Sequence, residues 1–219
     1  MVPAGSRGGK EQGNMKRKIQ DLAVMGGTPA FDKDLCVGTP NVGNRLRFIQ
    51  RVEDLLDRRW LTNDGPFVQE LENKIAGLHG VKHCVAMSNG TVALEIAIRA
   101  DGLKGEVIIP SYTFIATAHA LQWQQITPVF CDIDDQSYTL DPEQVEKRIT
   151  PRTTGILGVH LWGRACHTEA LQKIADKHHL RLLFDAAHSF GCSHLGRMIG
   201  GYGDAEVFSF HATKVFHTF

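Results

Sequence analysis

The stretch TGILGVHLWGRACHTEALQKIADKHHLRLLFDAA, residues 154–187, decides the fold class. It begins with a short apolar run at 154–160, continues with helical periodicity over 167–179, and returns to an apolar run at 180–187. A strand, a helix and a second strand in this order form a βαβ unit, whose strands are parallel and whose helix covers one face of the sheet. The stretch therefore predicts an α/β fold.

The same alternation extends on both sides of this unit. Further apolar runs that predict strands are 81–87, 106–110, 128–134 and 205–210; further helical patterns are 44–60, 67–78, 91–100, 115–123 and 142–149. Such alternation is typical of a mainly parallel sheet with helices on both faces. Ligands of these sheets bind at the carboxyl ends of the strands, so we expect the functional residues in the loops that follow them.

Length and composition limit the domain organisation and the partners. The 219 residues are enough for one large domain, 19–219, after a Gly-rich and basic stretch, 1–18, that is typical of a disordered extension and contains Met15 as an alternative start. Basic and acidic residues number 24 each, which argues against nucleic acid as a partner. No apolar run approaches the roughly 18 residues of a membrane span, and no signal peptide is evident. Five scattered cysteines without a CxxC pair favour a cytoplasmic location.

A small polar motif, Ser88-Asn89-Gly90-Thr91, follows the first apolar run and leads into a helical pattern. Glycine lets the backbone approach an anion, and the free amides of a helix start favour phosphate. An ordinary turn with Ser88 or Asn89 as the N-cap is the alternative. Neither GxGxxG nor GxxxxGK[ST] is present, so the motif does not predict a dinucleotide or P-loop site.

Asp185 stands at the carboxyl end of the apolar run 180–187. A carboxylate on a buried strand needs a partner, because an unpaired buried charge is costly. A protonated ring nitrogen of a cofactor would satisfy it and would keep the ring protonated as an electron sink. A helix cap, or pairing with Arg181 or Arg197, would satisfy it as well.

Lys214 follows the run 205–210 and stands 29 positions after Asp185, so both are expected at the same edge of the sheet. A lysine there can form an imine with an aldehyde cofactor and move protons as the free amine. A solvated surface lysine is the alternative. The hydroxyl of Ser209 can donate to a phosphate, or it belongs to a half-buried strand serine.

Four motifs in this order and spacing, SNGTVAL (88–94), PSYTFIATAHA (110–120), FDAAHSFG (184–191) and FSFHATKVF (208–216), resemble the DegT/DnrJ/EryC1/StrS family of sugar aminotransferases. The resemblance covers roughly Asp21 to Phe219 and rests on the joint pattern, which is far more specific than any one motif. It implies the large domain of the pyridoxal-phosphate (PLP) transferase fold type I, with a sheet of the seven-stranded type.

The resemblance also implies site residues. Lys214 matches the Schiff-base lysine of the internal aldimine, and Asp185 matches the partner of the pyridine nitrogen. The other positions that match cofactor contacts are Gly90, Thr91 and Ser209 at the phosphate, Phe114 stacked on the ring, and His188 near the phenolic oxygen. Without the resemblance, Phe114 is interpreted as core packing and His188 as a satisfied core histidine.

The activity implied by the resemblance is transfer of an amino group from glutamate to a nucleotide-linked keto-deoxysugar by a homodimer. One branch of the family carries histidine in place of the lysine and deoxygenates its substrate, so Lys214 indicates transamination. Relatives that act on cyclitols or make aminohydroxybenzoate are alternatives.

The chain stops five residues after Lys214, whereas the family continues into a smaller C-terminal domain. This length favours a fragment without independent activity and leaves a truncated, regulatory PLP-binding relative as an alternative. A metal-dependent enzyme that uses Asp185, His188, His194 or His211 is a third interpretation. No HExxH or similar compact ligand set is present, and we expect no metal.

Overall fold

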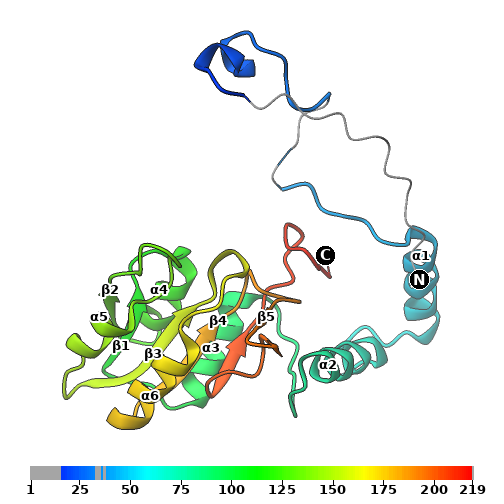
Figure 1. Ribbon diagram of the computed structural model, residues 1–219. Helices are drawn as coiled ribbons and strands as arrows, with labels where there is room; N and C mark the ends of the chain where they lie inside the picture. The colour runs from blue at the N-terminus through cyan, green and yellow to red at the C-terminus, as the bar shows by residue number, and fades with distance from the viewer. Residues whose placement is uncertain (1–15, 33–35, 37, 219) are drawn as a thin grey trace. The chain divides into compact units, whose positions relative to one another are not determined.

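The computed structural model describes residues 16–32, 36 and 38–218, and the chain divides into two compact units, Met1–Thr39 and Pro40–Phe219 (Figure 1). The first unit contains two short 3-10 turns, η1 (Ile19–Asp21) and η2 (Ala23–Met25). Most of the expected extension at 1–18, including Met15, lies outside the described residues.

The second unit contains a five-stranded parallel sheet in the order β2-β1-β3-β4-β7, and its α/β class is the one that the sequence predicts. Its strands are β1 (Glu106–Pro110), β2 (Thr127–Cys131), β3 (Thr153–Val159), β4 (Arg181–Asp185) and β7 (Ala205–Val207). Its helices are α1 (Arg45–Arg58), α2 (Pro66–His79), α3 (Gly90–Ala100), α4 (Ile115–Gln122), α5 (Pro142–Lys147), η3 (Leu161–Gly163) and α6 (Thr168–His178). A small antiparallel hairpin joins β5 (Ser193–His194) to β6 (Arg197–Met198).

Local sequence signals set the helix boundaries. The side chain of Asn44 caps α1 by accepting from the Arg47 amide, and Asp141 caps α5 in the same way through Glu143. Pro66 occupies the first turn of α2, where its missing amide costs nothing. Gly80 ends α2 with a φ of 66°, in the left-handed region that glycine enters without strain.

The sheet separates two apolar cores because successive side chains of a strand point to opposite faces. Val107 and Ile109 of β1 pack with α3 and α4, whereas Ile108 packs with α5 and α6. Leu183 of β4 belongs to the first core, and its neighbour Phe184 belongs to the second. Helices therefore cover both faces, as expected, and the carboxyl edge of the strands stays available for a site.

The run 81–87 was expected as a strand, but it forms none. Val85 is 66% exposed, and among the described residues no neighbouring strand pairs with this run. A strand needs hydrogen-bonding partners on a neighbouring chain segment, so apolar composition alone does not make one. The sheet consequently has five strands here.

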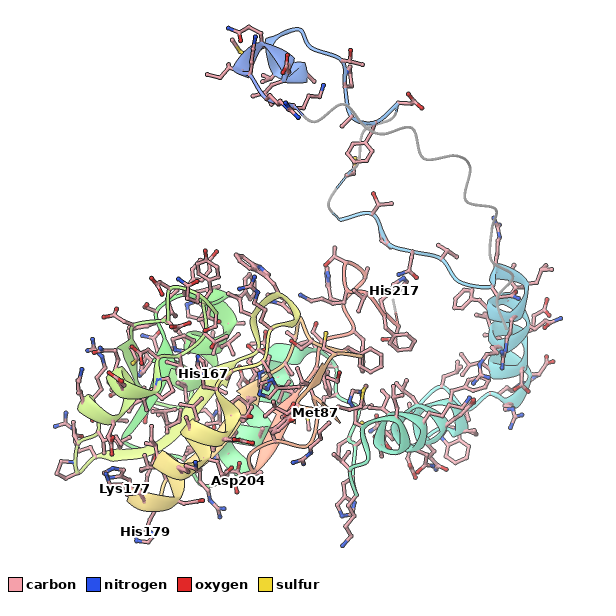
Figure 2. The ribbon with its side chains drawn as sticks, viewed as in Figure 1. Met87, His167, Lys177, His179, Asp204 and His217 are labelled. Carbon is pink, nitrogen blue, oxygen red and sulfur yellow. The ribbon has the colours of Figure 1, made fainter. Side chains whose placement is uncertain are left out.

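The residues that precede the strands and those that follow them lie at opposite ends of the sheet. Figure 2 shows Asp204, Lys177 and His179 at the end where β4 and β7 begin, far from His217, which follows β7.

No helix in the part of the chain that the structure describes is long and apolar enough to cross a membrane.

Candidate active site

Asp185 is the buried polar residue at the carboxyl end of β4, with 6% of its surface exposed. Its Oδ2 accepts a hydrogen bond of 2.8 Å from the Thr117 hydroxyl, and its Oδ1 accepts one of 3.1 Å from the Ala187 amide. Burial raises the pKa of the Asp185 carboxyl, and these two donors, with His188 and Lys214 nearby, oppose that rise.

Neither arginine that the sequence offers as a partner for Asp185 pairs with it. Arg181 forms its ion pair with Asp204 at 3.2 Å, and Arg197 donates to the carbonyl of Gly201. Among the residues that the structure describes, Asp185 has no ion-pair partner within 4.0 Å. The carboxylate thus has hydrogen-bond donors at both oxygens but no direct cation.

Lys214 and His188 lie close enough to Asp185 to affect it electrostatically. Lys214 is half-buried in the loop after β7, where its amide donates to the His211 carbonyl at 2.8 Å. Burial and the Lys214 cation lower the pKa of His188, while Asp185 opposes this. The structure therefore brings together three of the residues that the sequence predicts.

An aromatic cluster holds the loop that carries Lys214. Phe216 stacks on Phe190 with 5.2 Å between ring centroids, and Phe210 meets both rings edge-on at 5.1 and 5.4 Å. Phe208 contacts Phe190 edge-on at 5.7 Å. Because Phe190 belongs to the segment that follows Asp185, the cluster ties the two predicted cofactor loops to each other.

Gly90 and Ser209 face each other at the same edge. A Cβ on Gly90 would lie 3.5 Å from Ser209 Cβ and 3.8 Å from Ser209 Oγ. Gly90 and Thr91 form the first turn of α3, and the Asn89 side chain caps this helix by accepting from Val92 at 2.9 Å. The Asn89 side chain therefore caps one amide of this helix start, and the other free amides are still available to an anion.

Phe114 is 70% exposed at the position that precedes α4, so it does not pack in the core. His188 is half-buried, and its Nδ1 lies 3.5 Å from the Trp162 amide. The core alternative is therefore wrong for Phe114, and His188 is only partly buried.

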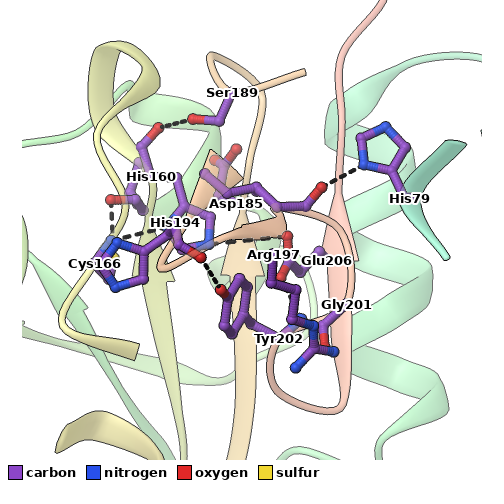
Figure 3. A network of polar contacts seen from close by, with 12 residues as sticks. His79, His160, Cys166, Asp185, Ser189, His194, Arg197, Gly201, Tyr202 and Glu206 are labelled. Atoms are coloured by element: carbon purple, nitrogen blue, oxygen red, sulfur yellow. Dashed lines mark hydrogen bonds and ion pairs between the residues drawn. The ribbon is translucent and has the colours of Figure 1, made fainter. Parts of the chain in front are cut away.

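His160 is a further residue of this region that sequence reasoning missed (Figure 3). Its amide donates to the Asp185 carbonyl at 2.9 Å, and its carbonyl accepts from the Ser189 hydroxyl at 2.8 Å. Its ring stacks on Phe184 at 4.5 Å, and its Nδ1 accepts from the Cys166 amide at 2.9 Å. His160 therefore holds both ends of the segment 185–189 by hydrogen bonds. In the sequence, the only sign of this role is that His160 follows the strand β3 directly.

The other ring nitrogen of His160 faces a buried acid. His160 Nε2 lies 3.9 Å from Glu206 Oε2, and neither atom has a hydrogen-bond partner within the described ranges. Burial raises the pKa of Glu206 to about 7 and lowers the pKa of His160 to about 3. Both groups are consequently neutral near pH 6.

Histidines and acids do not form a metal-binding group in the described part of the chain. No three His, Cys, Asp or Glu side chains gather there as ligands of one ion. The metal alternative thus lacks a ligand cluster among these residues.

Comparison with known proteins adds an independent finding to this geometry. Residues 44–219 match the DegT/DnrJ/EryC1/StrS aminotransferase family. The chain belongs to this family. The match includes every predicted site residue from Gly90 to Lys214, and it confirms the resemblance found in the sequence.

Named members of the family are similar along most of this chain. The dTDP-4-amino-4,6-dideoxy-D-glucose transaminase of Shigella dysenteriae is 43% identical over 86% of the chain and 52% of its own length. GDP-perosamine synthase of Caulobacter vibrioides is 38% identical over 76% of the chain and 46% of its own length. The chain therefore spans about half the length of the curated family members it matches.

Solved structures of the family share the fold. The structure of DesI with its TDP-sugar product is 55% identical and has a TM-score of 0.83, over 90% of this chain and 50% of that one. The PLP form of Spr1654 from Streptococcus pneumoniae is 27% identical with a TM-score of 0.80, over 84% of this chain and 51% of that one. The expected fold class is confirmed.

Proposed function

We propose that the protein is a PLP-dependent aminotransferase that transfers an amino group from glutamate to a nucleotide-linked keto-deoxysugar. The observation that carries this proposal is the Asp185 carboxylate, which is buried, hydrogen-bonded at both oxygens and without an ion-pair partner among the described residues, beside Lys214. A buried carboxylate in this state is suited to a cationic ring that arrives with a ligand.

The residues present fit pyridoxal phosphate. Gly90 leaves the space beside Ser209 that a larger side chain would fill, and the α3 amides and the Ser209 hydroxyl offer donors for the phosphate. Phe114, largely exposed at the start of α4, is available to cover a ring face. His188 would lie near the phenolic oxygen of the cofactor, as the resemblance implies.

Each residue would perform one task. When bound, the cofactor supplies an aldehyde that joins to amines and a ring that takes up negative charge. Asp185 would keep a negative charge opposite the ring nitrogen, and Lys214 Nζ would hold the cofactor and then carry a proton as the free amine. Gly90, Thr91 and Ser209 would fix the phosphate.

The substrate proposal rests on the relatives. Their names include dTDP, GDP and UDP sugars, and DesI was solved with a TDP-sugar product, so a nucleotide-linked sugar is the shared chemistry. An aminohydroxybenzoate synthase structure is also similar, at 35% identity. We propose a homodimer, as the resemblance implies, and a cytoplasmic location, in line with five cysteines that form no disulfide.

The test uses the purified protein after loading with PLP. Reduction of the PLP-loaded protein with borohydride, followed by peptide mapping, should place the label on Lys214. With glutamate and a dTDP-linked keto sugar, the protein should release 2-oxoglutarate, and Lys214→Ala should abolish both the label and the release. A label on another lysine would contradict the site.

The non-catalytic alternative predicts a different result in the same assay. A regulatory relative would retain the Lys214 label but would release no 2-oxoglutarate with any keto sugar. Replacing the keto sugar with an aminohydroxybenzoate precursor or a keto cyclitol distinguishes the remaining substrate classes.

A further inference from the structure

The segment that leads into α4 brings two hydroxyl groups to Asp185. Thr117 is fully buried, and its Oγ1 lies 2.8 Å from Asp185 Oδ2. Thr113, which precedes the N-cap of α4, has its Oγ1 2.9 Å from Thr117 Oγ1. The three side chains form a continuous line of hydrogen bonds that ends on the carboxylate.

The number of protons fixes the direction of this line. A threonine hydroxyl has one proton to donate, and an ionised carboxylate only accepts. Because the Thr117 proton lies toward Asp185, Thr117 Oγ1 accepts from the Thr113 hydroxyl. Donors in a line polarise one another, so the second hydroxyl strengthens the bond of the first to the carboxylate.

The same carboxylate has few other sources of stabilisation. The Ala187 amide donates to Oδ1, and the titratable groups that interact electrostatically with Asp185 include His188, Lys214 and the buried Cys166 thiol. Burial favours the neutral acid, and the Thr117 hydroxyl is the largest opposing influence. Without Thr117, Oδ2 would therefore lose its donor while it stays buried.

We propose that Thr117, supported by Thr113, is a positioning residue that keeps the Asp185 carboxylate ionised and aimed at the cofactor ring nitrogen. The inference rests on the proposed function, because it assumes that PLP binds at Asp185. Thr113 and Thr117 flank Phe114. One short segment would therefore contact a face of the cofactor ring through Phe114 and would hold the Asp185 carboxylate at the ring nitrogen through Thr117.

The test compares Thr117→Val, which removes the hydroxyl but keeps the branched shape, with Thr117→Ser, which keeps the hydroxyl. In full-length protein, absorbance titration should show that Thr117→Val weakens PLP binding by about tenfold to a hundredfold, as loss of a hydrogen bond to a buried charge does. Thr117→Ser should remain within about threefold of the wild type, and Thr113→Val should lie between the two. Thr153→Val, at the opposite edge of the sheet, is the matched control.

A second measurement needs no cofactor. Carbon-13 NMR of labelled aspartate in the apo protein should show a higher pKa for Asp185 in Thr117→Val than in the wild type and in Thr117→Ser. An unchanged Asp185 pKa in Thr117→Val, or PLP binding within about twofold of the wild type, would overturn the proposal. If Thr117→Val does not fold, Thr113→Val decides, and wild-type values for it in both measurements would overturn the proposal.

The two proposals fail in distinguishable ways. A wild-type protein that binds no PLP contradicts the proposed function, whatever the variants do. A wild-type protein that binds PLP together with an equally competent Thr117→Val contradicts only the role of Thr117.

Discussion

Replacing Glu206 with glutamine should make the protein more stable above neutral pH, and this gain should shrink as the pH falls toward 4.5. Glu206 is buried on β7 with its pKa raised from 4.5 to about 7, chiefly by burial, while the Tyr202 and Gly200 amides and Arg197 oppose that rise. Above pH 7 the protein must therefore bury a charged carboxylate that the unfolded chain would expose.

The sign and size follow from proton linkage. Between pH 4.5 and about 7 the folded protein holds a proton on Glu206 that the unfolded chain releases, so the unfolding free energy falls as pH rises through this window. The difference between the two pKa values corresponds to about 3 kcal/mol, and Glu206→Gln should recover up to that amount at about pH 8. The introduced amide keeps the oxygen that accepts from Tyr202.

His160 contributes the opposite slope. Its pKa is lowered from 6.5 to about 3 by burial and by His194, so the unfolded chain binds the extra proton between these values, and stability rises with pH there. In the wild type the two slopes largely cancel between pH 4.5 and 6.5. In Glu206→Gln only the His160 contribution should remain, so the unfolding free energy should rise with pH in this window.

The assay is urea unfolding of the apo protein, followed by circular dichroism at about pH 5 and about pH 8. Glu53→Gln, which changes an exposed carboxylate of α1, is the matched control and should leave the unfolding free energy unchanged at both pH values. If Glu206→Gln destabilises the protein at both pH values, Glu206 is ionised and paired with a protonated His160, and the reasoning is wrong.

Two further predictions concern the cofactor. Asp185→Ala should weaken PLP binding at least as much as Thr117→Val does, and it should lower turnover by a still larger factor, about a thousandfold or more, because the electron sink is lost while the phosphate contacts still hold the cofactor. Steady-state kinetics beside a PLP titration checks this, and equal losses of turnover and binding would contradict it. Gly90→Ala should preserve thermal stability, since its Cβ meets Ser209 at an ordinary contact distance of 3.5 Å, but should weaken PLP binding by filling the space beside that hydroxyl. Unchanged PLP affinity in this variant would exclude Gly90 from the phosphate site.

Most elements of the fold were predictable because hydrophobic periodicity and turn residues agree. The run 106–110 was expected as a strand and forms β1 with the same bounds, and the helix expected over 115–123 ends one residue earlier. The run 81–87 shows the limit of this reasoning, because strand formation depends on a neighbour that composition does not reveal. The β5–β6 hairpin was missed because its strands have two residues each, too few for a pattern.

The candidate site was predictable where a residue ends a strand, as Asp185 does, or follows one, as Lys214 does. The supporting residues were not. Thr117 sits in a helix of small and apolar residues and reaches a carboxylate 68 positions away, so nothing near it in sequence marks its role. His160 acts mainly through its backbone, whose hydrogen bonds are the same for any residue type.

The place of β7 in the sheet has a consequence for biosynthesis. Among the described strands, β7 pairs with β4 alone. The loop with Lys214 follows β7, so the ribosome adds Asp185 to the chain before the lysine that would complete the site. Under the proposed function, a nascent chain would hold the vitamin-derived aldehyde through Lys214 only after β7 has been synthesised and has paired with β4. Capture of the coenzyme during translation would then report that β7 has paired with β4.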